Sequence, residues 1–226
     1  MTKKKVFVVA LAVCLVAILS LGTLAWFNAQ DDVTNKFMIA DSDDDADDIF
    51  SVDVWEKTPE SDADQDGAEY KDILPGDLLD KEVYVENTGY YDQYVRVTIT
   101  ISDAQAWVDA LGSTYDPANL FVGYDATMFA ENHIWNNLQG ATTMPENLVY
   151  VMYLKNVLPA GQKVTLFTDV QIPETLTREQ AAAFVDNDFT VSVKAEAVQV
   201  DNVVPAGTAA GDAAYEAFKT VFPQNP

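Results

Sequence analysis

The sequence predicts an all-β domain, a jelly-roll-like antiparallel sandwich with short helical inserts. Strand-like runs dominate the chain, at spacings typical of an antiparallel sandwich. From position 95 to 101, apolar and polar residues alternate without a break, which predicts a strand with one buried and one solvated face. The expected strands are residues 49–55, 82–86, 94–102, 148–154, 163–172 and 189–200.

Turns and three short helices are expected between these strands. The turn-forming residues at 89–92 and 159–161 predict hairpin-type turns. A capping Asp103 or Ser102 opens the first helix, and the capping box Thr177-Arg178-Glu179-Gln180 opens the second. Residues 112–145 are too irregular to assign. The expected helices are residues 103–111, 178–184 and 213–222.

The N-terminus has the features of an export signal. Three lysines at 3–5 precede an unbroken apolar run at 6–19, as in the first two regions of a secretory signal. Thr23 and Ala25 supply the small residues at −3 and −1 if a type I signal peptidase cuts before Trp26. We therefore expect residues 1–25 to be a signal peptide.

A retained membrane anchor is the competing interpretation, because residues 6–25 are long enough to cross a bilayer as a helix. Cleavage is favoured, since the run ends in Gly22-Thr23 with no basic residue directly after it. The only membrane contact expected is through an uncleaved signal.

The remaining chain is strongly acidic. The full chain carries 36 Asp and Glu against 13 Lys and Arg, a formal net charge of −23, and loss of three signal lysines makes it −26. Such a surface repels nucleic acid and anionic lipid and attracts cations. The single cysteine, Cys14, lies in the signal, so the secreted chain has no disulfide or thiol chemistry.

Two acidic segments are candidates for cation binding or for solvated linkers. Asp62, Asp64 and Asp66 place oxygen donors at alternate positions before a glycine, like the first half of a calcium loop. The twelfth position holds Ile73 instead of a bidentate glutamate, although Glu69 or Asp72 could substitute in a loop that is not an EF-hand. We slightly favour the linker interpretation over a Ca²⁺ site. Residues 41–48 hold six aspartates in eight positions and predict a flexible acidic linker.

Catalysis has little support in the residues. His133 is the only histidine and is expected to be an ordinary loop residue. A zinc peptidase needs several placed ligands, and a serine triad would have to use the same histidine. We therefore predict no enzymatic activity.

Several segments carry a family resemblance. Residues 22–37, GTLAWFNAQDDVTNKF, look like the G-T-x-A-x-F-x-D…N-x-F junction of bacterial proteins exported through the SipW-type signal peptidase, the family that includes TasA and camelysin. The acidic insert after Ala40 departs from the family pattern. The likeness continues at residues 73–77, 83–89, 157–162 and 195–199.

This resemblance implies a secreted structural protein of the bacterial cell surface or biofilm matrix, with that peptidase, other matrix or surface proteins and its own copies as partners. It also carries a metallopeptidase label, but no metal ligand of camelysin can be placed here. Two alternatives therefore stay open. One is a calcium-dependent surface adhesin or binding module, and the other a camelysin-like metallopeptidase.

The resemblance also suggests how copies associate. Residues 26–40 would be a donor segment that pairs as a strand with a neighbouring subunit, while residues 49–226 form the sandwich. We expect the backbone of 32–40 to pair, with Val33, Phe37 and Ile39 alternating onto one face. A newly cut N-terminus has no obvious place in its own core.

Overall fold

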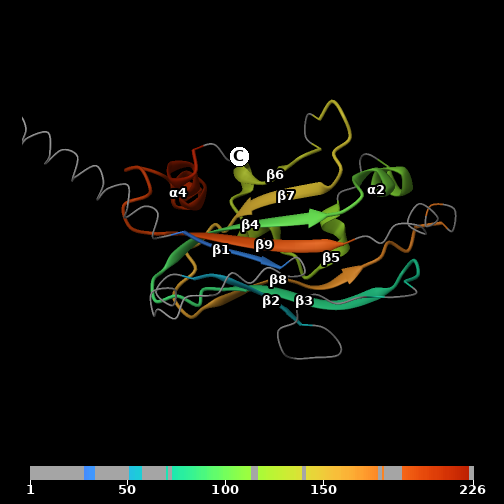
Figure 1. The fold of residues 1–226 in the computed structure, drawn as a ribbon, viewed down its shortest axis with the longest axis horizontal. Coiled ribbons are helices and arrows are strands. Elements are labelled where there is room, and N and C mark those ends of the chain that lie inside the picture. The colour runs from blue at the N-terminus through green and yellow to red at the C-terminus, as the bar shows by residue number, and fades with distance from the viewer. Residues whose placement is uncertain are drawn as a thin grey trace, which may run out of the picture.

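The computed structural model shows a sandwich of two antiparallel sheets (Figure 1). This arrangement confirms the predicted all-β sandwich. The structure describes residues 28–33 by their backbone, and also residues 51–57, 70, 73–112, 117–138, 141–177, 180 and 190–223.

The two sheets differ in size, and every pairing in them is antiparallel. The first sheet contains, in spatial order, β1 (Asn28–Val33), β9 (Val191–Gln199), β4 (Gln93–Ile101), β7 (Leu148–Tyr153) and β6 (Trp135–Asn136). The second contains β2 (Asp53–Lys57), β3 (Leu78–Glu86), β8 (Lys163–Gln171) and β5 (Phe121–Val122).

All six expected strands are present, with boundaries that shift most at β2 and β3. β2 begins at Asp53 rather than at residue 49 and continues to Lys57. β3 begins at Leu78, four residues before the expected start at residue 82. The first four residues of β3 read Leu-Leu-Asp-Lys, so apolar and polar residues do not alternate there, and the pattern that marks a strand in the sequence is missing.

The prediction of hairpin-type turns at 89–92 and 159–161 is wrong. β3 and β4 lie in different sheets, and so do β7 and β8, so each turn carries the chain from one sheet to the other. The same turn residues serve both purposes, because Gly, Asp and Pro favour tight backbone geometry whichever strand follows.

Asn87 fastens these two connections together. Its side-chain Nδ2 donates to the carbonyl oxygens of Tyr91 (2.8 Å) and Leu158 (2.9 Å), and its Oδ1 accepts from the backbone N–H of Gly89 (3.0 Å). The residue is fully buried. Asn87 therefore supplies hydrogen-bond partners to backbone groups of both connections, two of them in buried hydrogen bonds.

The main core fills the space between the sheets. The inward residues of β4, which are Val95, Val97, Ile99 and Ile101, pack there with Phe167 of β8. The alternation had predicted that the outward face of β4 is solvated along its whole length, and this prediction is wrong for part of that face. Helix α4 (Ala213–Val221) covers part of that face and forms a second apolar cluster with it (Figure 1).

The helical inserts agree with the sequence where the structure describes them. Asp103 caps α2 (Ala104–Leu111), accepting from the N–H of Ala106 at 3.1 Å. Thr177 and Gln180 bond each other reciprocally, which confirms the capping box, although residues 181–184 lie outside the described part. The region left unassigned, residues 112–145, contains β5, β6 and three 3-10 helices, which are η2 (Pro117–Leu120), η3 (Ala126–Met128) and η4 (Glu131–His133). A further 3-10 helix, η6 (Ala210–Asp212), directly precedes α4.

Candidate assembly edge

Strand β1 forms the edge of the first sheet. It pairs antiparallel with β9 of its own chain, from Asn28 opposite Val198 to Val33 opposite Val193. The other side of β9 is paired with β4, and β1 also lies near β2 of the second sheet. β1 is therefore the strand that covers an otherwise open side of β9.

The position of β1 differs from the expectation that the N-terminal segment has no obvious place in its own domain. The described strand begins at Asn28, upstream of the expected start at residue 32, and it does find a place in its own domain. Of the three residues expected to fill a groove, Val33 is the last residue of β1. Phe37 and Ile39 lie outside the described residues.

A buried ion pair lies on the outer surface of the first sheet, next to this edge. Arg96 of β4 is directly opposite Glu196 of β9, and its Nη2 and Nε lie 2.7 Å and 2.8 Å from Glu196 Oε2. The two side chains are only 5% and 6% exposed. Short, charge-assisted hydrogen bonds of this kind join the two strands firmly when both charges are retained.

Helix α4 provides the cover over this pair. The guanidinium carbon of Arg96 lies 4.9 Å from the ring centroid of Phe218 and 5.7 Å from that of Phe222. These are cation–π distances, and the rings also exclude water. Tyr153 of β7 packs edge-on against Phe218, and burial raises the pKa of its hydroxyl.

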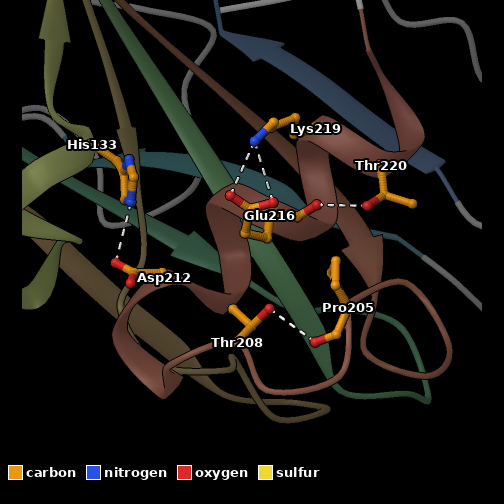
Figure 2. A network of polar contacts seen from close by, with 7 residues as sticks. All are labelled: His133, Pro205, Thr208, Asp212, Glu216, Lys219 and Thr220. Carbon is orange, nitrogen blue, oxygen red and sulfur yellow. Dashed lines mark hydrogen bonds and ion pairs between the residues drawn. The ribbon is translucent and has the colours of Figure 1, made fainter.

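The start of α4 is held by His133. Its ring stacks on Tyr215 at 3.8 Å between centroids, and its Nε2 lies 3.2 Å from Asp212 Oδ1 (Figure 2). His133 was expected to be an ordinary loop residue, and it serves here as a packing residue between η4 and α4. Further along α4, Lys219 bonds Glu216, on the helix's own surface (Figure 2).

Lys194 is the cation on β9 beside the ion pair. Its Nζ lies 3.6 Å from Glu196 Oε1, and its side chain is 31% exposed. The register places Lys194 opposite Thr98 of β4 on one side and Asp32 of β1 on the other. β9, the strand next to the edge, therefore presents a positive group opposite a defined position of β1, in a chain whose net charge is −23.

The other sequence-predicted site residues fall outside the described part of the chain. These are the calcium candidates Asp62, Asp64, Asp66 and Glu69, the cleavage-site residues Thr23, Ala25 and Trp26, and the acidic stretch 41–48. Across the residues that the structure does describe, no group of three or more His, Cys, Asp or Glu side chains is placed to hold a metal ion.

Tyr70 is the first described residue after the acidic segment that holds the calcium candidates. Its hydroxyl donates to the carbonyl oxygen of Asp80 at 2.6 Å. Burial, followed by the nearby carboxylates of Glu56, Asp80 and Asp169, raises the pKa of Tyr70 to about 12. Asp80 and Asp169 are directly opposite each other on β3 and β8. Of these three carboxylates, Glu56 is paired with Lys81 at 2.6 Å, while Asp80 and Asp169 place two acidic residues opposite each other.

A groove of about 320 Å³ lies beside α2 and is lined by uncharged residues. Among its lining residues in the described ranges, none is ionisable, so it offers no acid–base pair. Its lining residues are Val108, Leu138, Ala141, Thr142, Thr143 and Met144.

No helix in the described ranges is long and apolar enough to cross a membrane. The apolar run at 6–25 lies outside those ranges.

Comparisons of the chain with family models, with curated proteins and with solved structures gave no significant match in any of the three.

Sequence reasoning missed the charged residues at the edge. Arg96 appeared only as a polar position in an alternating strand, and Glu196 only as part of the A-E-A-V-Q segment. A signal does exist, because arginine and glutamate are each flanked by apolar residues in two strong strand patterns. Opposite charges at such positions indicate a cross-strand pair once the strands are known to be neighbours.

Proposed function

We propose that this chain is a secreted structural protein of the bacterial cell surface or biofilm matrix, and that its copies join into fibres by exchanging β1. The observation that carries the proposal is the position of β1, a short N-terminal strand held at a sheet edge by a single neighbouring strand in the first sheet. A strand in that position can be replaced by the same strand of another copy, with identical backbone pairing.

The length of chain after β1 permits the exchange. Residues 34–50 separate β1 from the first described residue of the body, Ser51. At roughly 3.3 Å per extended residue, they reach about 55 Å, which is more than a small domain's width. A strand could therefore leave its own sheet and enter a neighbour's while each body stays folded.

The edge position of β1 supports the same mechanism, because in the first sheet β1 pairs with β9 alone. Loss of β1 uncovers the hydrogen-bonding groups of β9, and an uncovered edge strand readily pairs with another chain.

The proposal includes a jelly-roll topology. The last strand, β9, lies between β1 and β4, and β8 lies between β3 and β5, while the chain passes between sheets from β3 to β4 and from β7 to β8. Interleaved order of this kind supports two superimposed Greek keys. The N-terminal junction at 22–37 supports kinship with the TasA and camelysin family.

Negative-stain microscopy of the secreted protein, with and without residues 26–40, tests the proposal. The complete protein should form fibres, and the truncated protein should remain a folded but less stable monomer. A synthetic peptide of residues 26–40 should restore the stability of the truncated protein without restoring fibres. The peptide pairs with the open side of β9, but it has no such edge with which to bind a further copy. Fibres formed by the truncated protein would exclude β1 exchange.

A calcium-dependent surface module is the second candidate, favoured by the opposed carboxylates of Asp80 and Asp169 near Tyr70, which follows the acidic segment in the sequence. If the loop binds Ca²⁺ only in the folded state, the melting temperature should rise with Ca²⁺ and fall with chelator. Asp64→Ala and Asp66→Ala should both abolish the response. Asp109→Ala, which removes a carboxylate from α2 instead, is the matched control and should preserve it. Coincident melting curves for every condition would leave the loop as a solvated linker.

A further inference from the structure

We propose that Lys194 makes the β9 edge selective, so that it accepts an extended acidic strand in one register, the one that puts Asp32 opposite Lys194. The acidic strand is β1, either from the same chain or from a second copy. The inference deepens the proposed function, and only its second-copy form rests on that function. Within one molecule, the pairing of β1 with β9 is enough to carry it.

Of the charged residues on β9, Lys194 is the one that can attract the carboxylate of a strand pairing with it. Glu196 is engaged by Arg96 at 2.7 Å, and both side chains are buried beneath α4. Lys194 is farther from Glu196, at 3.6 Å, and is partly exposed. The three side chains together carry a charge of about +1 at neutral pH. The edge is therefore locally positive on a protein of net charge −23.

The sequence of β1 places an acidic residue opposite Lys194 in the observed register but not in the nearest competing ones. A shift of one residue would exchange the two faces of the strand, so the nearest competitors are shifts of two. One of them moves Asp32 away from Lys194 to a position opposite Glu196, and the other moves it to a position opposite Ser192. The observed register is the one of the three that places an acidic residue opposite the lysine.

The selection should be modest in size and sensitive to salt. Opposite charges directly across an antiparallel pair favour the pairing by about 1.4- to 5-fold, and salt screens a charge that is partly exposed, as that of Lys194 is. A small bias suffices here, because the competing registers have the same backbone hydrogen bonds and differ mainly in which side chains face each other.

The test is a double-mutant cycle measured by hydrogen exchange of residues 28–33. It uses the full chain in detergent micelles, diluted so that each β1 can pair only with its own β9. The variants are Lys194→Gln, Asp32→Asn and their combination, with protection factors normalised for each sequence. Asp31→Asn is the matched control, because Asp31 lies opposite Ala195 rather than a charged residue. A Lys194→Arg variant retains the charge.

Each single neutral variant should lower the protection of β1 by about 1.4- to 5-fold, and the double variant should be no worse than either single one. Lys194→Arg should keep most of the protection, and about 0.5 M salt should shrink the difference between wild type and Lys194→Gln. Additive effects of Asp32→Asn and Lys194→Gln, or equal coupling of Asp31→Asn to Lys194→Gln, would overturn the inference.

A second arm concerns assembled protein and separates this inference from the proposed function. If the cycle shows coupling but no fibres form at any concentration, Lys194 still selects the chain's own strand and the fibre proposal fails. If fibres form but neither fibres nor dilute protein show the coupling, assembly stands and the role of Lys194 is wrong. Coupling in both supports recognition of the same strand from a second copy.

Discussion

Replacing Arg96 by methionine should lower the free energy of unfolding by about 3 kcal/mol, because the buried Glu196 loses its two short hydrogen bonds and keeps the more distant Lys194, whose Nζ lies 3.6 Å from its Oε1. Methionine keeps much of the side-chain volume, so the loss reports mainly on charge rather than on a cavity. Urea unfolding at pH 7, followed by tryptophan fluorescence, gives the value, provided that m stays unchanged. β1 amides should also lose protection, since Glu196 lies on the strand that β1 pairs with.

The matched controls separate burial from charge. Lys219→Met removes a cation from an ion pair on the surface of α4, where the lysine is 57% exposed, and should change stability by less than about 1 kcal/mol. Adding Glu196→Met to Arg96→Met should recover most of the loss, because the buried site then holds no unpaired charge. Equal costs for Arg96→Met and Lys219→Met would show that the pair is solvated and that α4 does not cover it.

The position of this pair links the C-terminal helix to the N-terminal strand. α4 covers Arg96 and Glu196, Glu196 belongs to β9, and the opposite side of β9 holds β1. Whatever loosens α4 therefore exposes a charged pair on the strand that forms the assembly edge. We infer that α4 helps to hold β9 in the position that its pairing with β1 requires.

The strands were predictable because their signal is local. In β4 the alternation from Val95 to Ile101 comes from burying one face against the other sheet, and it is visible in seven consecutive residues. The capping box at Thr177 is also local, since its two hydrogen bonds join residues three positions apart.

The features that define the edge depend on contacts between distant parts of the chain. Arg96 and Glu196 are 100 residues apart, and the helix that covers them, α4, lies still further along the chain. Sheet membership is equally non-local, which is why the turn at 89–92 could be recognised but not its role in crossing between sheets. For the N-terminal segment, the sequence predicted strand pairing but not the start at Asn28 or the partner β9.

A disulfide between β1 and β9 should abolish fibre formation while it is oxidised and allow it when reduced. Ala29 lies directly opposite Ala197 in the register, so Ala29→Cys with Ala197→Cys brings two thiols together. Opposite Cα atoms in antiparallel strands are about 4.5–5.5 Å apart, within the range that a disulfide spans. The secreted chain has no other cysteine, because Cys14 lies in the segment expected to be removed.

The order of oxidation and assembly makes the result decisive. Oxidised before assembly, each β1 is locked in its own sheet, and microscopy should show monomers alone. Reduced, the same protein should assemble like wild type, as should the single variant Ala197→Cys under both conditions. Oxidised after assembly, the bond should join neighbouring copies, because each β9 then holds another copy's strand, and non-reducing gels should show a ladder of covalent multimers. Fibres grown from fully oxidised monomers, or a gel with monomer alone after oxidation of reduced fibres, would mean that β1 stays in its own sheet and that the fibre contacts lie elsewhere.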